Sequence, residues 1–189
     1  GGDLGSQVVH IRRAAIVGHH TGAVIALEMA ASQPDRVAAL VLSSMSMIDA
    51  ARRSVRSGAY NIDEVESRSD GSHLTELWRR RRPYYPQDDT QLLERYLIDA
   101  MKAGPLAAEG HRVVNRYHME SRLPEICCPT LVIGADSDPH AYPSAVRVVS
   151  AISGSRLCVI EGGMLPLPDQ MPEPFAVVIM DLFRATRLS

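Results

Sequence analysis

The sequence contains few lysines, cysteines and aromatic residues. Lys102 is its only lysine, so nearly all positive charge comes from arginine, and the formal net charge is −2. A chain so close to neutrality has no bulk attraction for a polyanion, and we expect no nucleic-acid partner. The three cysteines are odd in number and match no zinc-ligand spacing, which argues against a disulfide framework and predicts no metal site.

Long apolar runs and targeting signals are also missing. No segment approaches the roughly 20 apolar residues that span a membrane, and the first residues lack the basic stretch and apolar core of a signal peptide. We therefore expect a cytoplasmic protein with no membrane partner. The chain of 189 residues is 46% hydrophobic and 22% charged, which is ordinary for one globular domain with a substantial core.

The most informative segment joins a strand, a sharp turn and a helix. Residues 14–17 are apolar on both faces, residues 18–22 read GHHTG, and a helix is predicted from about Thr21 to Ser32. Gly18 and Gly22 lie two residues to either side of His20, a spacing that allows a sharp reversal with close strand–helix packing. His20 is expected in a strained backbone conformation, with its side chain exposed above the sheet.

The rest of the chain alternates in the same way, apart from one long helical segment. A strand over 37–44 completes a strand–helix–strand unit and predicts a parallel sheet. We interpret three parts: residues 1–44 as the first part of an α/β core, 45–124 as a helical cap insertion, and 125–189 as the second part of the core. Further elements are predicted as a helix over 3–11, strands over 129–134 and 157–160, and helices over 143–152 and 174–184.

Three short motifs in this order resemble the C-terminal part of an α/β-hydrolase. They are GHHTG at 18–22, PTLVIGADSDP at 129–139 and EGGM at 161–164. The resemblance implies a mostly parallel sheet with flanking helices and a helical cap. The family's first four strands, and the loop that supplies one oxyanion donor, have no counterpart here. An exposed sheet edge is therefore expected, covered either by an upstream segment missing from this sequence, which we favour, or by a partner such as a second copy of the chain.

The resemblance also assigns site residues, and two of the family's three catalytic positions are altered. His20 stands where the family has its nucleophile, usually serine, and Met164 stands where the family has its histidine base. Asp138 matches the family's acid. Because a thioether is no proton acceptor, a serine–histidine relay is excluded, and His20 is the candidate base or nucleophile with Asp138 as its partner. His19, Thr21 and Met164 are expected around the oxyanion site and pocket, the Thr21 N–H being one oxyanion donor.

Several functions remain open on these residues. The leading one is an enzyme that acts on a small, largely apolar ester, lactone or related carbonyl substrate, without a cofactor. The alternatives are a catalytically inactive ligand-binding protein and, less favoured, a lyase or decarboxylase. The arginine-rich run at 78–82 is interpreted as the solvated end of a cap helix from which one arginine could reach a substrate carboxylate. Five residues are candidates for an apolar pocket wall: Met45, Met47, Trp78, Tyr84 and Tyr85.

Overall fold

A computed structural model describes residues 11–56 and 61–186 of the chain. Its centre is a four-stranded parallel sheet with strand order β1-β2-β3-β4. The predicted α/β class and parallel sheet are confirmed, and the helix expected over 3–11 lies, except for its last residue, outside the described residues. The strands are β1 (Ala14–His19), β2 (Val37–Ser43), β3 (Thr130–Ala135) and β4 (Arg156–Ile160).

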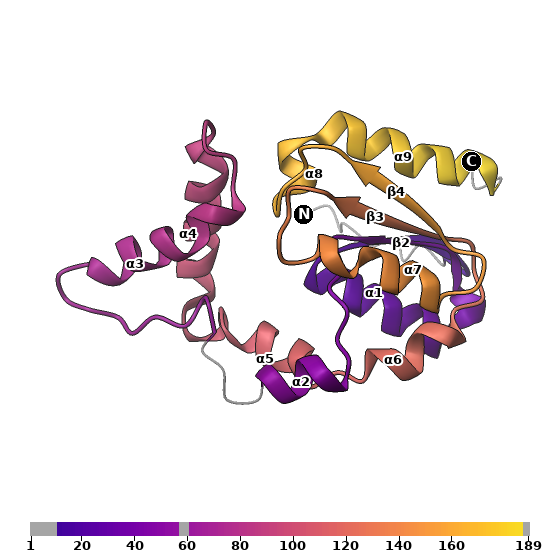
Figure 1. Ribbon diagram of the computed structural model, residues 1–189, viewed down its shortest axis with the longest axis horizontal. Coiled ribbons are helices and arrows are strands. Elements are labelled where there is room, and N and C mark those ends of the chain that lie inside the picture. Colours follow the sequence, from indigo (N-terminus) through magenta and orange to yellow (C-terminus); the bar gives the residue numbers. More distant parts are fainter. Residues whose placement is uncertain (1–10, 57–60, 187–189) are drawn as a thin grey trace, which may run out of the picture.

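The middle strands are apolar on both faces because helices cover both faces of the sheet. Every residue of β2 and β3 is buried. On one face lie α1 (Thr21–Ser32) and α7 (Ala145–Ala151); on the other lie α8 (Leu167–Gln170) and α9 (Pro172–Ala185) (Figure 1). Two apolar clusters result, one between the sheet and α1 and α7, the other between the sheet and α9.

The segment predicted as the cap, residues 45–124, contains helices and irregular stretches, and no strand occurs in its described part. It contains α2 (Ala50–Arg56), α3 (Ser72–Arg81), α4 (Thr90–Ala103), α5 (Glu109–Arg116) and α6 (Met119–Arg122). Figure 1 shows α3 and α4 standing well apart from the sheet. Short 3-10 turns complete the chain: η1 (Pro34–Arg36), η2 (Arg82–Tyr84), η3 (Gly104–Leu106), η4 (Leu123–Glu125) and η5 (Tyr142–Ser144).

The last helix of the cap is anchored on the core. Met119 of α6 is fully buried in the cluster beside α1. Glu28 of α1 accepts hydrogen bonds from the Tyr117 hydroxyl at 2.6 Å and from Nε of Arg122 at 2.9 Å. The end of the cap is thereby held against the sheet by both apolar packing and charge.

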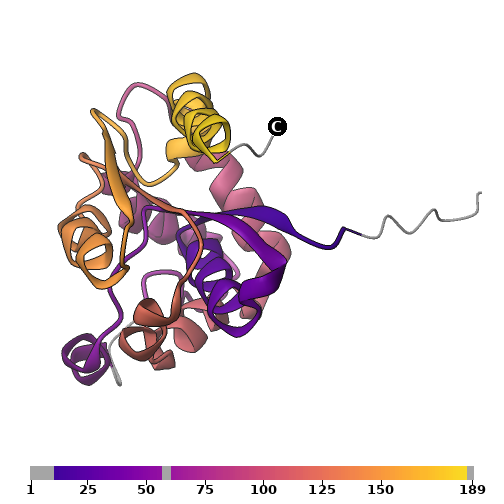
Figure 2. The same cartoon turned by 90° about the vertical axis from the view of Figure 1, so that its right-hand side faces the viewer.

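The edge of the sheet at β1 is open within the described residues. β1 pairs with β2 on one side, and Figure 2 shows it at the border of the sheet opposite β4. The side chain of Val17 is accordingly 43% exposed. This agrees with the expected exposed edge, and what covers that edge is still a matter for prediction. None of the described helices is both long enough and apolar enough to span a membrane.

Candidate functional site

The turn between β1 and α1 places His20 in a strained conformation. His20 has φ 48° and ψ −116°, a region that residues with a Cβ seldom adopt. Its N–H donates to the Ser43 carbonyl at 3.0 Å, so the β1–β2 ladder holds the turn in place. A Cβ on Gly18 would lie 2.3 Å from the Gly22 carbonyl oxygen, so only glycine fits at position 18. The same argument is wrong for Gly22, where an added Cβ would meet nothing within 4 Å.

His20 faces Asp138 directly. Nε2 of His20 lies 3.1 Å from Oδ2 of Asp138, and both atoms are buried. This distance is within hydrogen-bond reach, although the two groups are not aligned as a regular hydrogen bond. Asp138 follows β3 and is fully buried, while the His20 side chain is 21% exposed. The imidazole at the turn therefore meets the carboxylate with no residue between them.

The Asp138 carboxylate is held in its charged form. Oδ1 accepts backbone N–H groups from His140 at 2.9 Å and from Ala141 at 3.2 Å. Burial alone would raise the pKa of Asp138, but the His20 imidazole and these two N–H groups outweigh burial, and the pKa lies below its ordinary value. Asp138 is therefore ionised at neutral pH and can orient the imidazole.

His19 lies next to the His20 ring and is held neutral. Its Nδ1 is 2.9 Å from the Ser43 hydroxyl, and its Nε2 is 2.9 Å from the Leu165 carbonyl oxygen. Because a carbonyl only accepts, Nε2 carries the proton and Nδ1 accepts from Ser43. Burial lowers the pKa of His19 to about 4, with a further contribution from His20. The His19 and His20 rings meet edge to face at 4.6 Å.

A third histidine and an arginine continue this row. The rings of His20 and His140 are stacked, 6.4 Å apart and 25° from parallel. Nη2 of Arg52, on α2, lies 3.2 Å from Nε2 of His140, which therefore accepts the bond. Arg52 could not be identified from the sequence, because nothing local marks a residue of the cap as a neighbour of position 140.

Thr21 lines the cavity of the site, whereas Met164 does not. Thr21 is the first residue of α1, so its N–H has no acceptor within the helix, and it lines the cavity described next. Met164 follows β4 and is half-buried; its N–H donates to Oε1 of Gln170 at 2.7 Å. From this loop the cavity is lined by Leu165 and Pro166, and Met164 is not among the lining residues.

One large cavity of about 1220 Å³ joins the carboxyl end of the sheet to the cap. Its lining includes His19, His20 and Thr21 from the sheet side and Tyr84 and Tyr85 from the cap. The two tyrosines confirm part of the predicted apolar wall. The prediction is wrong for the other three candidates: Met45 and Met47 are buried in the core beside α1, and Trp78 packs in the tyrosine cluster of the cap.

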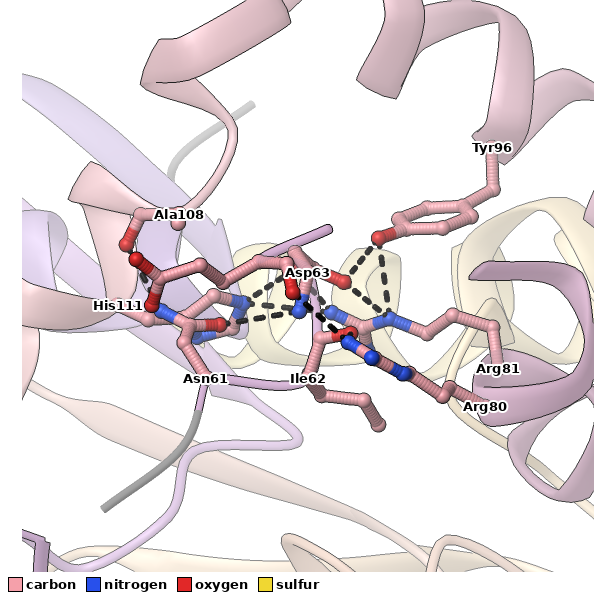
Figure 3. Close-up of polar contacts among 9 residues, drawn as sticks. Asn61, Ile62, Asp63, Arg80, Arg81, Tyr96, Ala108 and His111 are labelled. Atoms are coloured by element: carbon pink, nitrogen blue, oxygen red, sulfur yellow. Dashed lines mark hydrogen bonds and ion pairs between the residues drawn. The ribbon is translucent and has the colours of Figure 1, made fainter. Parts of the chain in front are cut away.

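A buried charge cluster forms the cap side of this cavity (Figure 3). Oδ1 of Asp63 accepts from Nε of Arg81 at 2.7 Å and from the Tyr96 hydroxyl, and Oδ2 accepts from Nη2 of Arg81 and from Nε2 of His111 at 2.7 Å. Burial would raise the pKa of Asp63, but these donors outweigh burial and hold the pKa far below its ordinary range.

The cluster corrects the interpretation of the arginine-rich run. Arg81 is only 6% exposed, so at this position the run is not a solvated helix end. The cluster could not be predicted from the sequence, because Asp63 lies in an irregular segment before α3 that has no helical or strand pattern to place it. The sequence did hold one indication of it. Four consecutive arginines on a helix cannot all face solvent, so one of them must point toward the body of the cap.

The described residues contain no group of three or more histidine, cysteine, aspartate or glutamate side chains arranged to hold a metal ion. His19, His20 and His140 are neighbours, but they contact one another by their ring faces and edges. The donor atoms therefore do not converge on one point, as a tetrahedral metal site requires.

The chain matches none of the protein families with which it was compared. Among curated proteins it is similar to "Putative carbamate hydrolase RutD" of Klebsiella pneumoniae, with 27% identity over 171 residues that cover 83% of this chain and 60% of that protein. Among solved structures it is similar to a hydrolase from Pseudomonas aeruginosa, with a TM-score of 0.71, 22% identity and coverage of 92% of this chain and 65% of the other.

A third relative is the enol-lactonase of Burkholderia xenovorans, with a TM-score of 0.65, 18% identity and coverage of 92% of this chain and 66% of the other. At these identities the structural matches establish the fold. The chain has the α/β-hydrolase fold over part of that fold's extent, which confirms the resemblance drawn from the three motifs. It spans 60% of the length of the curated relative.

Proposed function

We propose that this chain carries the reaction centre of a hydrolase for a small, largely apolar ester, lactone or related carbonyl substrate. In this proposal His20 is the base and Asp138 its partner. The observation that carries the proposal is the 3.1 Å approach of the His20 imidazole to the buried Asp138 carboxylate, beside a cavity that has room for a small molecule.

The orientation of His20 favours a base that acts on water. An ionised Asp138 favours the tautomer that carries its proton on Nε2, the ring nitrogen 3.1 Å from Oδ2, so Nδ1 keeps its lone pair. Nδ1 takes a proton from a water molecule, and the oxygen of that water attacks the substrate carbonyl. The imidazolium then returns the proton to the leaving oxygen as the C–O bond breaks, which yields an acid and an alcohol.

The start of α1 offers a place for the negative charge that develops on the carbonyl oxygen. Thr21 is the first helical residue, and its N–H lies at the positive end of the helix dipole. His19 supports the same arrangement because it is neutral and hydrogen-bonded at both nitrogens, so it does not compete for the proton. The names of the relatives agree with this class of reaction, since they include a lactonase and a carbamate hydrolase.

The proposal is tested by His20→Ala in the complete chain, with hydrolysis of phenyl acetate, phenyl butyrate and γ-butyrolactone as the assays. We expect kcat to fall about 1000-fold, within the usual range for loss of a general base, while the circular dichroism spectrum is retained. Asp138→Asn should lower kcat less. His118→Ala, an exposed histidine at the rim of the same cavity, is the matched control.

Two outcomes would contradict the proposal. Unchanged turnover in His20→Ala would remove His20 from the reaction, and saturable binding of these compounds without turnover would favour the ligand-binding alternative. Mass spectrometry of the quenched reaction separates base from nucleophile, since only a nucleophile leaves an acyl group on His20.

A further inference from the structure

We infer that the Asp63–His111 pair is a ligand-binding site on the cap side of the cavity, and that Nδ1 of His111 accepts a hydrogen bond from the hydroxyl group of an aromatic ligand. The inference goes beyond the proposed function, which concerns His20 and Asp138 on the sheet side. It gives the cap cluster, which the proposed reaction does not use, a part in selecting the molecule that enters the cavity.

The contact between His111 and Asp63 decides which ring nitrogen carries the proton. Nε2 of His111 lies 2.7 Å from Oδ2 of Asp63. Two acceptor atoms would repel one another at this distance, so Nε2 carries a proton and donates a hydrogen bond to the carboxylate. Nη2 of Arg81 lies 3.3 Å from the same nitrogen, but it donates to Oδ2 of Asp63 instead. In the neutral ring the lone pair is therefore on Nδ1.

Nδ1 of His111 is the atom of the cluster that is open to a ligand. The side chain of His111 is 36% exposed and lines the cavity, whereas the side chain of Asp63 is 5% exposed. Within the part of the chain that the structure describes, Nδ1 has no hydrogen-bond partner. The two nitrogens of an imidazole point in different directions, so the contact of Nε2 with Asp63 turns Nδ1 away from the carboxylate. The pair thus presents one unused acceptor at the cavity wall.

The charges of the cluster favour a neutral donor as the ligand group. Although burial raises it, hydrogen bonds from His111 and Arg81 hold the pKa of Asp63 far below its ordinary range, so this carboxylate is ionised. Its charge is paired with that of the Arg81 guanidinium, which is also buried. A ligand ammonium would be repelled by Arg81, and a ligand carboxylate has no proton to donate to Nδ1. A hydroxyl group meets both conditions.

The wall beside this pair is aromatic. The Tyr96 hydroxyl donates to Oδ1 of Asp63, and Figure 3 shows Tyr96 and His111 on opposite sides of that carboxylate. The rings of Tyr96 and Tyr85 are 5.9 Å apart, and both residues line the cavity. A ligand ring can pack on these rings by stacking or edge to face. A phenol is also a stronger donor than an alcohol, because its hydroxyl is more acidic. The ligand class is therefore a phenol, free or as the hydroxyaryl group of a larger molecule.

The test is an NMR titration of the native chain, with nitrogen-15 in its histidines, at pH 8. The two probes are phenol and fluorobenzene, which has nearly the same size but no donor. Phenol should move the Nδ1 signal of His111 from that of a bare nitrogen toward that of a hydrogen-bonded one, and fluorobenzene should not. Phenol should also bind about 5-fold more tightly, which is the usual size of one neutral hydrogen bond.

Two variants assign this preference to His111. His111→Phe keeps a ring but removes both nitrogens, so it should bring the affinities for phenol and fluorobenzene close together. His118→Ala, which changes an exposed histidine at the same cavity, is the matched control and should keep the preference of the native chain. Should His111→Phe fail to fold, the Nδ1 signal of the native chain decides by itself.

A role of His111 limited to holding Asp63 predicts a different result. In that case the Nδ1 signal does not respond to phenol, or His111→Phe weakens the binding of phenol and fluorobenzene by the same factor. Either result overturns the inference. A proton on Nδ1 in the free chain at pH 8 overturns it as well, because that nitrogen would then have no lone pair to offer.

Binding without turnover separates this inference from the proposed function. Phenol should move the Nδ1 signal of His111 in His20→Ala as it does in the native chain. If phenol binds in this way but no ester is hydrolysed, the proposed function fails and the phenol site stands. If esters are hydrolysed through His20 while the Nδ1 signal of His111 ignores phenol, the phenol site fails alone.

Discussion

The two walls of the cavity are built by different interactions. On the sheet side, backbone geometry sets the positions, since His20 is held at φ 48° by the ladder and Asp138 is fixed by the turn after β3. On the cap side, charge sets the positions, through ion pairs such as Arg81–Asp63. The proposed reacting groups are therefore placed by the rigid part of the fold, while the cap supplies groups whose placement depends on their ionisation.

The sheet and the cap also differ in how many of their residues are buried. β2 is buried along its whole length, whereas α5 has no buried residue and α3 buries only Leu77 and Arg81. The Asp63 cluster joins the irregular segment before α3 to α3, α4 and α5, so the cap relies on polar contacts where the sheet relies on packing.

The largest expected effect comes from moving the base back to the position that the resemblance gives it. His20→Ser alone should lower ester hydrolysis about 1000-fold, because it removes the proposed base. Adding Met164→His should recover at least about 100-fold and should make position 20 reactive toward a fluorophosphonate, as a hydroxyl activated by a neighbouring imidazole is. Kinetics and mass spectrometry measure the two effects.

Recovery in this double variant would show that the sheet side still has the geometry of a serine-type site. No recovery would show that the backbone at position 164 no longer places a side chain toward the turn, in line with the absence of Met164 from the cavity lining. Met164→Leu in the His20→Ser background is the control for a change of size alone.

A smaller effect is expected from breaking the cap cluster. Asp63→Asn removes the charge that Arg81 and His111 share, and loss of one partner of a buried pair costs about 3 kcal/mol. Amide hydrogen exchange should speed up in α3, α4 and α5, while β2 and β3 serve as internal controls. Equal acceleration in the strands would mean that cap and sheet unfold together and would contradict the contrast drawn above.

The stability of the cap should depend on pH through the same residue, Asp63. Because the pKa of Asp63 is lower in the folded chain than in the unfolded chain, its contribution to stability is present above about pH 4 and is lost as pH falls further. The protection of cap amides relative to the intrinsic exchange rate at each pH should therefore fall below about pH 4, and Asp63→Asn should remove this step.

The smallest expected effect is the contribution of His19, on the sheet side, to the free energy of unfolding. It falls in a different pH range from that of Asp63. Folding lowers the pKa of His19 from 6.5 to about 4, so the unfolded chain binds the proton more strongly and stability falls as pH drops from 6.5 toward 4. At pH 5 this amounts to roughly 2 kcal/mol relative to pH 8. Urea unfolding followed between pH 8 and pH 4 measures it, and His19→Gln should flatten this part of the profile.

Much of the fold could be predicted from the sequence because its signals are local. All four strands were expected within two residues of their ends, since each is a short apolar run between turn residues. The short helices α2, α5 and α6 were not expected, because segments of four to eight residues are too short to show a helical pattern clearly. Helices of this length depend on contacts with other parts of the chain, such as the burial of Met119 beside α1.

The candidate site was only partly predictable. His20 and Asp138 were paired on a motif resemblance, and the structure brings them within 3.1 Å. Arg52 and the Asp63 cluster were not identified as cavity groups, because their positions depend on how the cap folds and where it lies relative to the sheet. Several residues expected to line the pocket, such as Met45, are core residues instead.

The sequence by itself determined the parallel sheet, the turn at residues 18–22 and the unusual histidine at its tip. These follow from apolar runs, from the close approach that only Gly18 permits, and from residue identity alone. The tertiary structure decided that this histidine meets the Asp138 carboxylate and that arginines of the cap face the same cavity. Some of these contacts join residues more than a hundred positions apart, and only the packing of the whole chain sets their distances.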